Sequence, residues 1–144
     1  MYNQTSTKDN TTMKTKIALF GIGLLLLLVS CQNTNTAALE KEWKLVSLNG
    51  ANYETYSVTL DILADNLTRI SGQGFCNGYF APSTIATAGV FSVDVIASTK
   101  KACLDASISE YELEYFHALE QVTDWVISGE NLILSAENVK IVYK

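Results

Sequence analysis

Short runs of alternating apolar and polar residues, separated by turn signals, constrain the fold of this chain more than any other feature. In residues 56–63, Val58, Leu60 and Ile62 alternate with polar neighbours, which is the period of a half-buried strand and not of a helix. Asn49-Gly50 is a dipeptide typical of hairpin turns. Many such runs with a single helix predict a mainly β fold, an antiparallel barrel or strongly curled sheet whose open side or end the helix covers.

The expected strands are short, and their boundaries follow Gly, Asn, Asp and Ser residues. Pro82 is the single proline of the chain, and it predicts an edge strand or a strand end because proline has no backbone donor. Residues 64–66 are expected to form a turn. The expected strands are residues 42–48, 56–63, 67–71, 79–82, 83–87, 90–95, 124–128, 132–134 and 139–143.

One helix is expected, beginning at Ser107 or Ser109 and ending at Gln121. Each of the two serines has a glutamate three residues later, which is the spacing of a capping box. Three glutamates in the first turns would interact favourably with the helix dipole: Glu110, Glu112 and Glu114. The apolar stripe, which must be buried, consists of Ile108, Tyr111, Tyr115, Phe116, Leu119 and Val122.

The N-terminal part of the chain is typical of an export signal. Lys14 and Lys16 follow Met13, residues 17–29 are apolar apart from two glycines, and this run ends in Leu28-Val29-Ser30-Cys31. The apolar run is shorter than the ~20 residues of a membrane span, so a signal peptide is favoured over a transmembrane helix. Residues 28–31 resemble the lipobox of bacterial lipoproteins, in which the cysteine is acylated and becomes the first mature residue.

This resemblance implies lipidation of Cys31 and a chain of three parts. Residues 1–30 are the signal peptide, with 13–30 as the signal proper and 1–12 as an upstream mis-start or a long polar n-region. Residues 31–40 are the lipidated cysteine and a polar tether, and residues 41–144 are one domain. A single acyl chain binds a protein to a membrane only weakly and reversibly, so several chains on Cys31 would anchor the domain firmly. Gln32 after the cysteine implies, by similarity to enteric lipoproteins, a cell-envelope protein anchored in the outer membrane.

Two cysteines, Cys76 and Cys103, remain once the lipidation site is set aside. In an exported chain this predicts one disulfide, and two free buried thiols are the alternative. Cys76 lies in the stretch Gly72-Gln73-Gly74-Phe75-Cys76-Asn77-Gly78. Its three glycines indicate backbone with positive φ or very close approach by other atoms.

The acidic balance of the chain excludes several partners. The formal net charge is -5 at pH 7, and the segment before Cys31 removes three lysines but only one aspartate. The mature domain is therefore more acidic than the whole chain. Nucleic acid and anionic lipid head groups both require a basic face. We expect no nucleic-acid partner, and we expect membrane contact through the lipid on Cys31.

No group of residues indicates catalysis or a cofactor. The single histidine, His117, falls on the polar side of the expected helix, and no nucleophile stands at a recognisable spacing from it. Cys76, Cys103 and His117 are acceptable zinc ligands, but they lack the spacing of a zinc motif, and export favours the disulfide. We therefore expect a non-enzymatic protein with no metal site and no cofactor.

Aromatic residues are numerous for a domain of this size, and two interpretations are open. They either fill a small barrel or line a cavity for a small apolar ligand. Tyr79 and Phe80 lie beside the glycines on an expected edge, and we expect them to be exposed. The candidate recognition patch consists of Gly74, Phe75, Asn77, Tyr79 and Phe80.

Several of these motifs together resemble the META domain, the HslJ-like family of small envelope lipoproteins. The most specific matches are Gly72, Gly74 and Cys76-Asn77, followed by the Thr-x-x-Ala-Cys motif that ends at Cys103. Further matching positions are Trp43-Lys44-Leu45, Glu112, Tyr115, Leu119, Val122, Trp125, Gly129, Leu132 and Leu134. The resemblance implies a curled antiparallel β-barrel of lipocalin-like topology with one α-helix packed on it.

The resemblance also implies an association with heat shock and envelope stress. The resulting hypothesis is a non-enzymatic, membrane-anchored envelope lipoprotein. It would contribute to envelope integrity or to tolerance of heat and antibiotics by binding a protein or envelope partner. The alternative is a carrier that holds a small apolar ligand in the barrel interior.

Overall fold

A computed structural model describes residues 35–63, 67–103 and 105–144 of the chain. The expected signal peptide, Cys31 and the expected turn at 64–66 lie outside the described residues. The elements in chain order are η1 (Thr36–Leu39), β1 (Lys41–Leu48), β2 (Ala51–Asn52), β3 (Thr59–Ile62), β4 (Arg69–Gln73), β5 (Gly78–Ile85), β6 (Phe91–Val93), β7 (Ala97–Ser98), α1 (Ala106–Gln121), β8 (Asp124–Ser128), β9 (Asn131–Ala136) and β10 (Val139–Tyr143).

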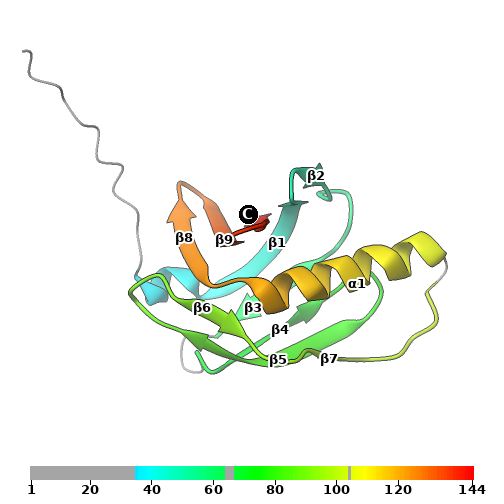
Figure 1. Cartoon of the computed structure of the whole chain (residues 1–144), viewed down its shortest axis with the longest axis horizontal. Coiled ribbons are helices and arrows are strands. Elements are labelled where there is room, and N and C mark those ends of the chain that lie inside the picture. Colours follow the sequence, from blue (N-terminus) through cyan, green and yellow to red (C-terminus); the bar gives the residue numbers. More distant parts are fainter. Residues whose placement is uncertain (1–34, 64–66, 104) are drawn as a thin grey trace, which may run out of the picture. The chain divides into compact units, whose positions relative to one another are not determined.

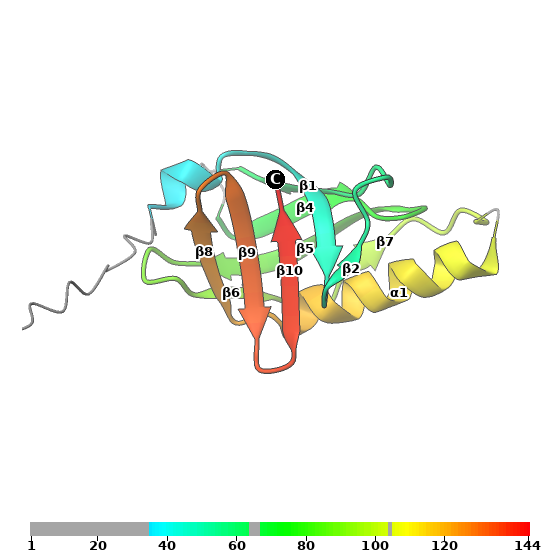
Figure 2. The same cartoon turned by 90° about the horizontal axis from the view of Figure 1, so that it is seen from above.

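The strands form an antiparallel meander that curls into a nearly closed barrel (Figures 1 and 2). Their order is β6-β5-β4-β3-β1-β10-β9-β8, with β2 added to β1 and β7 added to β5. The two outer strands approach each other at an isolated bridge between Val90 and Asp124, and the N–H of Trp125 donates to the Gly89 carbonyl at 2.7 Å. The predicted barrel of lipocalin-like, sequential strand order is therefore confirmed.

Strand β1 joins the two halves of the barrel and contains a bulge. Its first half pairs with β3 and its second half with β10, and the register to β10 shifts between Leu45 and Ser47. An extra residue in one strand reverses which side chains face the core. Trp43, Leu45 and Leu48 are therefore buried. Simple alternation along residues 42–48 predicts instead that Ser47 shares a face with Trp43 and Leu45 and that Leu48 lies on the opposite face.

Strand β5 is one continuous strand of eight residues, so the prediction of an edge or strand end at Pro82 is wrong. It lies between β4 on one side and β6 and β7 on the other. Within β5, Tyr79 and Phe80 pair with β7, and the residues from Ser83 to the end of the strand pair with β6. Pro82 lies opposite the break between these two short strands, where a missing N–H interrupts no continuous ladder.

Helix α1 begins earlier than the sequence predicted. Asp105 is its N-cap and Ala106 its first residue, so Ser107 and Ser109 lie inside the helix and neither acts as the N-cap. The predicted end at Gln121 is confirmed. The helix lies across the barrel (Figure 1) and packs on β6 and β10. Its buried residues are Glu112, Tyr115, Ala118 and Leu119.

Large side chains fill the interior of the barrel. Leu39 of η1 is 0% exposed, and its carbonyl accepts the indole N–H of Trp43 at 3.0 Å. Leu39, which was expected to belong to the polar tether, is therefore part of the packed core. None of the helices in the part of the chain that the structure describes is long and apolar enough to cross a membrane. The largest fully buried side chains include Trp43, Tyr115, Tyr143 and Phe91.

Candidate functional site

The glycine-rich loop, residues 72–78, includes the end of β4 and the start of β5. It lies against α1, and its shape depends on two of its three glycines. A Cβ atom on Gly74 would lie 2.8 Å from Oε2 of Glu112, and one on Gly72 would collide with the Thr59 carbonyl. Gly78 has room, because the nearest atom to its Cβ position is 3.9 Å away. None of the three is among the described glycines with positive φ. Close approach is therefore the reason for Gly72 and Gly74.

Glu112 is only 7% exposed, and both of its carboxylate oxygens accept hydrogen bonds from this loop. Oε2 accepts the N–H groups of Cys76 and Asn77, and Oε1 accepts the side-chain N–H of Asn77, each at 2.7 Å. A buried carboxylate is costly unless donors satisfy it. The prediction that Glu112 serves the helix dipole is wrong, because Glu112 lies beyond the first turn of α1 and binds the loop.

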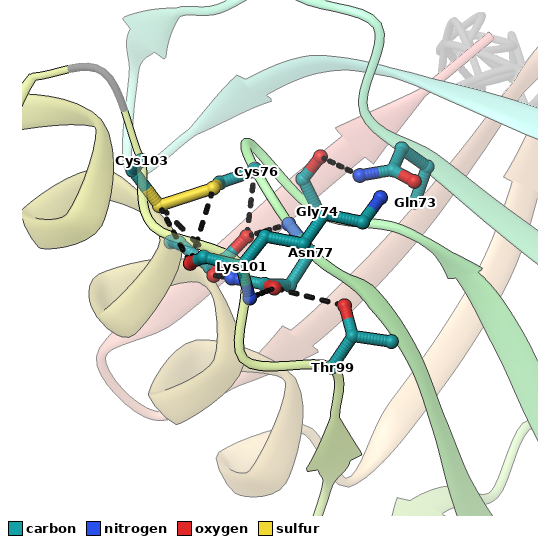
Figure 3. The surroundings of a disulfide bond; sticks show 8 residues. Gln73, Gly74, Cys76, Asn77, Thr99, Lys101 and Cys103 are labelled. Atoms are coloured by element: carbon teal, nitrogen blue, oxygen red, sulfur yellow. Dashed lines mark hydrogen bonds between the residues drawn. A yellow bond between two sulfur atoms is a disulfide. The ribbon is translucent and has the colours of Figure 1, made fainter.

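Asn77 connects the loop to the segment between β7 and α1. Its Oδ1 accepts the hydroxyl of Thr99 and the N–H of Lys101, both at 2.8 Å (Figure 3). Its own carbonyl accepts the N–H of Gly74 at 2.7 Å. Asn77 itself is 6% exposed, and its bonds to Thr99 and Lys101 are partly buried. A fully satisfied buried network of this kind holds its segments in one arrangement.

Cys76 and Cys103 form a disulfide, with their Cα atoms 5.8 Å apart (Figure 3). The predicted pairing is therefore confirmed over the alternative of two free thiols. The bond links residues 27 apart in sequence, and the chain-entropy model gives about 3.5 kcal/mol of stabilisation for such a loop. Because Asn77 follows Cys76, the disulfide and the hydrogen bonds of Asn77 are two separate links between the same two segments.

The five residues of the predicted recognition patch do not form one exposed surface. Gly74 and Asn77 are buried in the loop, Phe75 is half-buried, and Phe80 is 47% exposed. Tyr79 is only 4% exposed, so the expectation of its exposure is wrong. Successive residues of a strand face opposite sides, and in the continuous strand β5 this directs Tyr79 into the barrel and Phe80 outward.

Three tyrosine hydroxyls form a chain inside the barrel. Tyr79 donates to the Thr59 carbonyl at 2.9 Å, its oxygen lies 2.9 Å from that of Tyr115, and the oxygens of Tyr115 and Tyr143 are 3.1 Å apart. Burial raises the pKa of all three phenols, that of Tyr115 to about 12. The three groups stay neutral, because burial disfavours the charged form. The chain therefore joins α1 to β5 and β10 without a buried charge.

A hollow of about 470 Å³ opens at the surface beside the disulfide. Its lining consists of Phe75, Cys76, Lys101, Ala102, Cys103, Asp105 and Ile108. Phe75 also belongs to an aromatic cluster in which all ring centroids lie 5.1 to 6.2 Å apart. The aromatic cluster consists of Tyr53, Tyr56, Phe75 and Tyr111. We call the hollow the disulfide hollow, and its wall is continuous with the aromatic cluster through Phe75.

A second hollow of about 580 Å³ lies on the outer face of the sheet. It contains Glu42 and Asp61, which are directly opposite each other on β1 and β3, and Phe80. Burial, and next the charge of Glu42, raise the pKa of Asp61. The guanidinium carbon of Arg69 lies 4.6 Å from the ring centroid of Phe80. We call this hollow the acidic groove, defined by Glu42, Asp61 and Phe80.

The remaining candidates for chemistry lie apart from these features. The side chain of His117 is 64% exposed, with Nδ1 3.9 Å from Oε2 of Glu120, so its predicted place on the polar side of the helix is confirmed. Within residues 35–63, 67–103 and 105–144, no three His, Cys, Asp or Glu side chains are grouped to hold a metal ion. Cys31, the expected lipidation site, lies outside those ranges.

Residues 36–143 match the family model described as META domain. The NMR structure of a protein from Burkholderia xenovorans is similar in fold, with a TM-score of 0.59 and 17% sequence identity, over 76% of this chain and 87% of that chain. A second NMR structure has a TM-score of 0.58 and 18% identity, over 74% and 89%. At these identities the likeness shows the fold alone. No curated protein matches the chain.

Proposed function

Because the chain belongs to the META domain family, we propose that it is a non-enzymatic, lipid-anchored envelope protein that supports envelope integrity or stress tolerance by binding a partner. Leu28-Val29-Ser30-Cys31, directly after an apolar run, carries the membrane attachment. The packed domain begins at η1, whose first residue is Thr36. An extended chain spans at most ~3.5 Å per residue, so the anchor would hold the domain within about 20 Å of the membrane.

The acidic groove is the surface that best supports partner binding. Glu42 and Asp61 are directly opposite each other, and like charges in this arrangement weaken a sheet. A lysine or arginine from a partner would relieve that repulsion. Phe80, 47% exposed, offers an apolar contact in the same groove. We propose a polypeptide partner that places a basic side chain between the two carboxylates and an apolar side chain on Phe80.

The carrier function has less support than partner binding. Aromatic and aliphatic side chains with almost no exposed surface occupy the barrel interior, among them Trp43, Phe91 and Tyr143. The disulfide hollow and the acidic groove both open at the surface. A small apolar ligand in the interior would have to displace packed side chains, and repacking of this kind costs about 1–3 kcal/mol.

Membrane attachment is tested by metabolic labelling of the full chain with a palmitate analogue, followed by separation of inner and outer membranes. We expect label on the wild-type chain in the outer-membrane fraction. The variant Cys31→Ser should carry no label and leave the membrane fraction. Cys76→Ser, which removes a cysteine from the folded domain, is the matched control and should remain labelled. Equal labelling of Cys31→Ser and wild type would refute the anchor.

Partner binding is tested by complementing a deletion strain that is exposed to heat and to hydrophobic antibiotics. We expect increased sensitivity on deletion and full rescue by the wild-type chain. The variant Asp61→Lys should fail to rescue, because it reverses one charge of the groove. Glu130→Lys is the control, because it reverses the charge of an acid outside the groove, on the turn between β8 and β9. The side chain of Glu130 is 81% exposed, and its ion pair with Lys144 is at the surface. Unaltered sensitivity of the deletion strain would remove the stress role, and rescue by Asp61→Lys would remove the groove as the binding surface.

A further inference from the structure

We propose that the Cys76–Cys103 disulfide is a thiol-exchange site, and that the disulfide hollow receives a polypeptide dithiol, with apolar residues beside the cysteine that attacks first. Both cysteines line the hollow, and both are half-buried, so part of each residue remains accessible to solvent. The proposal goes beyond partner binding at the acidic groove and does not depend on the membrane anchor.

The walls of the hollow define which thiols fit. Phe75, Ala102 and Ile108 supply apolar surface around the disulfide, and Lys101 and Asp105 add one charge of each sign at the same hollow. The hollow therefore has no net preference for a charged partner. Burial of one apolar side chain against these walls favours binding. A cysteine flanked by apolar residues is the thiol that this surface favours.

The fold retains both cysteine-bearing segments when the disulfide is open. The N–H groups of Cys76 and Asn77 are bonded to Glu112 of α1. The segment that leads to Cys103 is held separately, by the bonds from Thr99 and Lys101 to the side chain of Asn77. None of these bonds uses a sulfur atom. Loss of the disulfide therefore removes its entropic contribution to stability while the two thiols stay close together.

The surroundings of the two sulfurs favour attack on Cys76. The amide nitrogen Nδ2 of Asn77 donates one N–H to Glu112 and lies 4.0 Å from Sγ of Cys103. Its second N–H therefore stabilises a thiolate on Cys103 as that sulfur leaves. The Lys101 carbonyl oxygen lies 3.9 Å from both sulfurs and accepts the S–H of a protonated thiol. The reduced state thus has a donor for the thiolate and an acceptor for the thiol in place.

The exchange proceeds by two successive thiol attacks. The partner thiolate attacks Sγ of Cys76, a mixed disulfide forms, the Cys76–Cys103 bond breaks, and Cys103 leaves as a thiolate that takes up a proton. A second thiol of the partner attacks the mixed disulfide and releases Cys76 as a thiol. The partner dithiol loses two electrons and two protons in forming its own disulfide, and Cys76 and Cys103 gain them.

The first test follows adduct formation on the full chain in detergent with two single-cysteine peptides, one with leucines and one with serines beside the cysteine. Acid quenching and peptide mapping locate the mixed disulfide. We expect the adduct on Cys76, formed about 10-fold faster with the leucine peptide because one apolar side chain is buried. Adducts that form equally on Cys76 and Cys103, or at equal rates with both peptides, would overturn the proposal.

A matched pair of helix variants tests whether the hollow directs the exchange. Ile108→Lys places a charge in the hollow, and we expect it to lower the rate with the leucine peptide to that of the serine peptide. Leu113→Lys changes a residue that is 59% exposed and is not among those lining the hollow. It should leave both rates unchanged. An unchanged rate in Ile108→Lys would remove the hollow from the proposal.

The second test asks whether the reduced chain stays folded. We expect dithiothreitol to open the disulfide without denaturant, and the near-ultraviolet circular dichroism and cooperative unfolding to persist with a lower midpoint. Removal of the reductant should restore the disulfide. The double variant Cys76→Ser/Cys103→Ser should show the same reduced midpoint and form no adduct. A disulfide that resists reduction until the chain unfolds, or a chain that unfolds on reduction, would show that the bond is purely structural.

Discussion

Glu112 and Asn77, 35 residues apart in sequence, are joined by two hydrogen bonds of 2.7 Å to the two oxygens of one carboxylate. Because the side-chain N–H of Asn77 is bound to Glu112, its amide oxygen is directed toward Thr99 and Lys101. The orientation of one amide thereby fixes three parts of the chain: α1, the glycine-rich loop and the segment before α1. The disulfide is added to an arrangement that these bonds already define.

Glu112→Gln should destabilise the domain by about 2 kcal/mol, because hydrogen bonds to a buried charged group are worth about 1.5–3 kcal/mol. Glutamine retains one acceptor oxygen, and its amide group would bring a donor against the side-chain N–H of Asn77. Glu110→Gln is the control, since Glu110 is exposed on the same helix, and its effect should be within ~0.5 kcal/mol. Urea unfolding of both variants measures the difference. Equal stabilities of Glu112→Gln and Glu110→Gln would show that the carboxylate of Glu112 does not contribute to stability through its hydrogen bonds.

Gly74→Ala should destabilise the domain by about 1–3 kcal/mol, the usual range for overpacking. Its Cβ would lie 2.8 Å from Oε2 of Glu112 and 3.1 Å from the Phe116 ring. Gly78→Ala is the matched control in the same loop, because its nearest neighbour would be 3.9 Å away. We expect the control to be neutral within ~0.5 kcal/mol. A comparison of thermal midpoints decides between them, and similar midpoints would contradict the packing argument.

Local patterns in the sequence predicted most of the fold. Period-two runs located the strands, and Asn49-Gly50 forms the predicted turn between β1 and β2, with positive φ at both residues. The errors in the strands lie where a distant partner decides the local structure. The bulge in β1 depends on its register with β10. The continuity of β5 through Pro82 depends on the break between β6 and β7.

The candidate site was harder to predict because its central residue looks ordinary in sequence. Glu112 resembles the other glutamates of α1, and charge alone assigned it to the helix dipole. The spacing of Glu112 along the helix, by contrast, indicates burial. Glu112 precedes Tyr115 by three residues and Leu119 by seven, and thus falls on the buried stripe. A carboxylate on that stripe needs donors, which the N–H groups of a glycine-rich loop supply.

The buried tyrosines should make the folded state sensitive to alkaline pH. Burial raises the pKa of Tyr115 from 10.0 to about 12, so the folded chain holds this proton more tightly than the unfolded chain. Stability from this group is complete below pH 10 and decreases as the pH rises toward 12. We expect phenolate absorbance from these residues to rise only as near-ultraviolet circular dichroism is lost. Their ionisation near pH 10 in an intact domain would contradict this account.

Tyr143→Phe tests the same hydroxyl chain at neutral pH. The variant removes the hydroxyl that lies 3.1 Å from that of Tyr115 and keeps the ring that packs in the core. We expect a loss of about 1 kcal/mol, the net contribution of a typical hydrogen bond. Tyr56→Phe is the control, because Tyr56 is 36% exposed and its hydroxyl can reach water. Chemical denaturation measures both, and an unchanged stability in Tyr143→Phe would show that the chain contributes nothing.

Asp61→Asn should stabilise the domain at neutral pH. Burial and the charge of Glu42 raise the pKa of Asp61 above 3.8, so the folded state favours the protonated form. The corresponding stability is present below pH 3.8 and is lost as the pH rises through the raised value. Because much of the carboxyl group reaches solvent, screening limits the gain to about a few tenths of a kcal/mol. Urea unfolding at pH 4 and pH 7 measures the effect, which should shrink in high salt. Glu54→Gln, at an exposed acid outside the groove, is the control. A variant Asp61→Asn that is less stable at pH 7 would contradict the repulsion between Asp61 and Glu42.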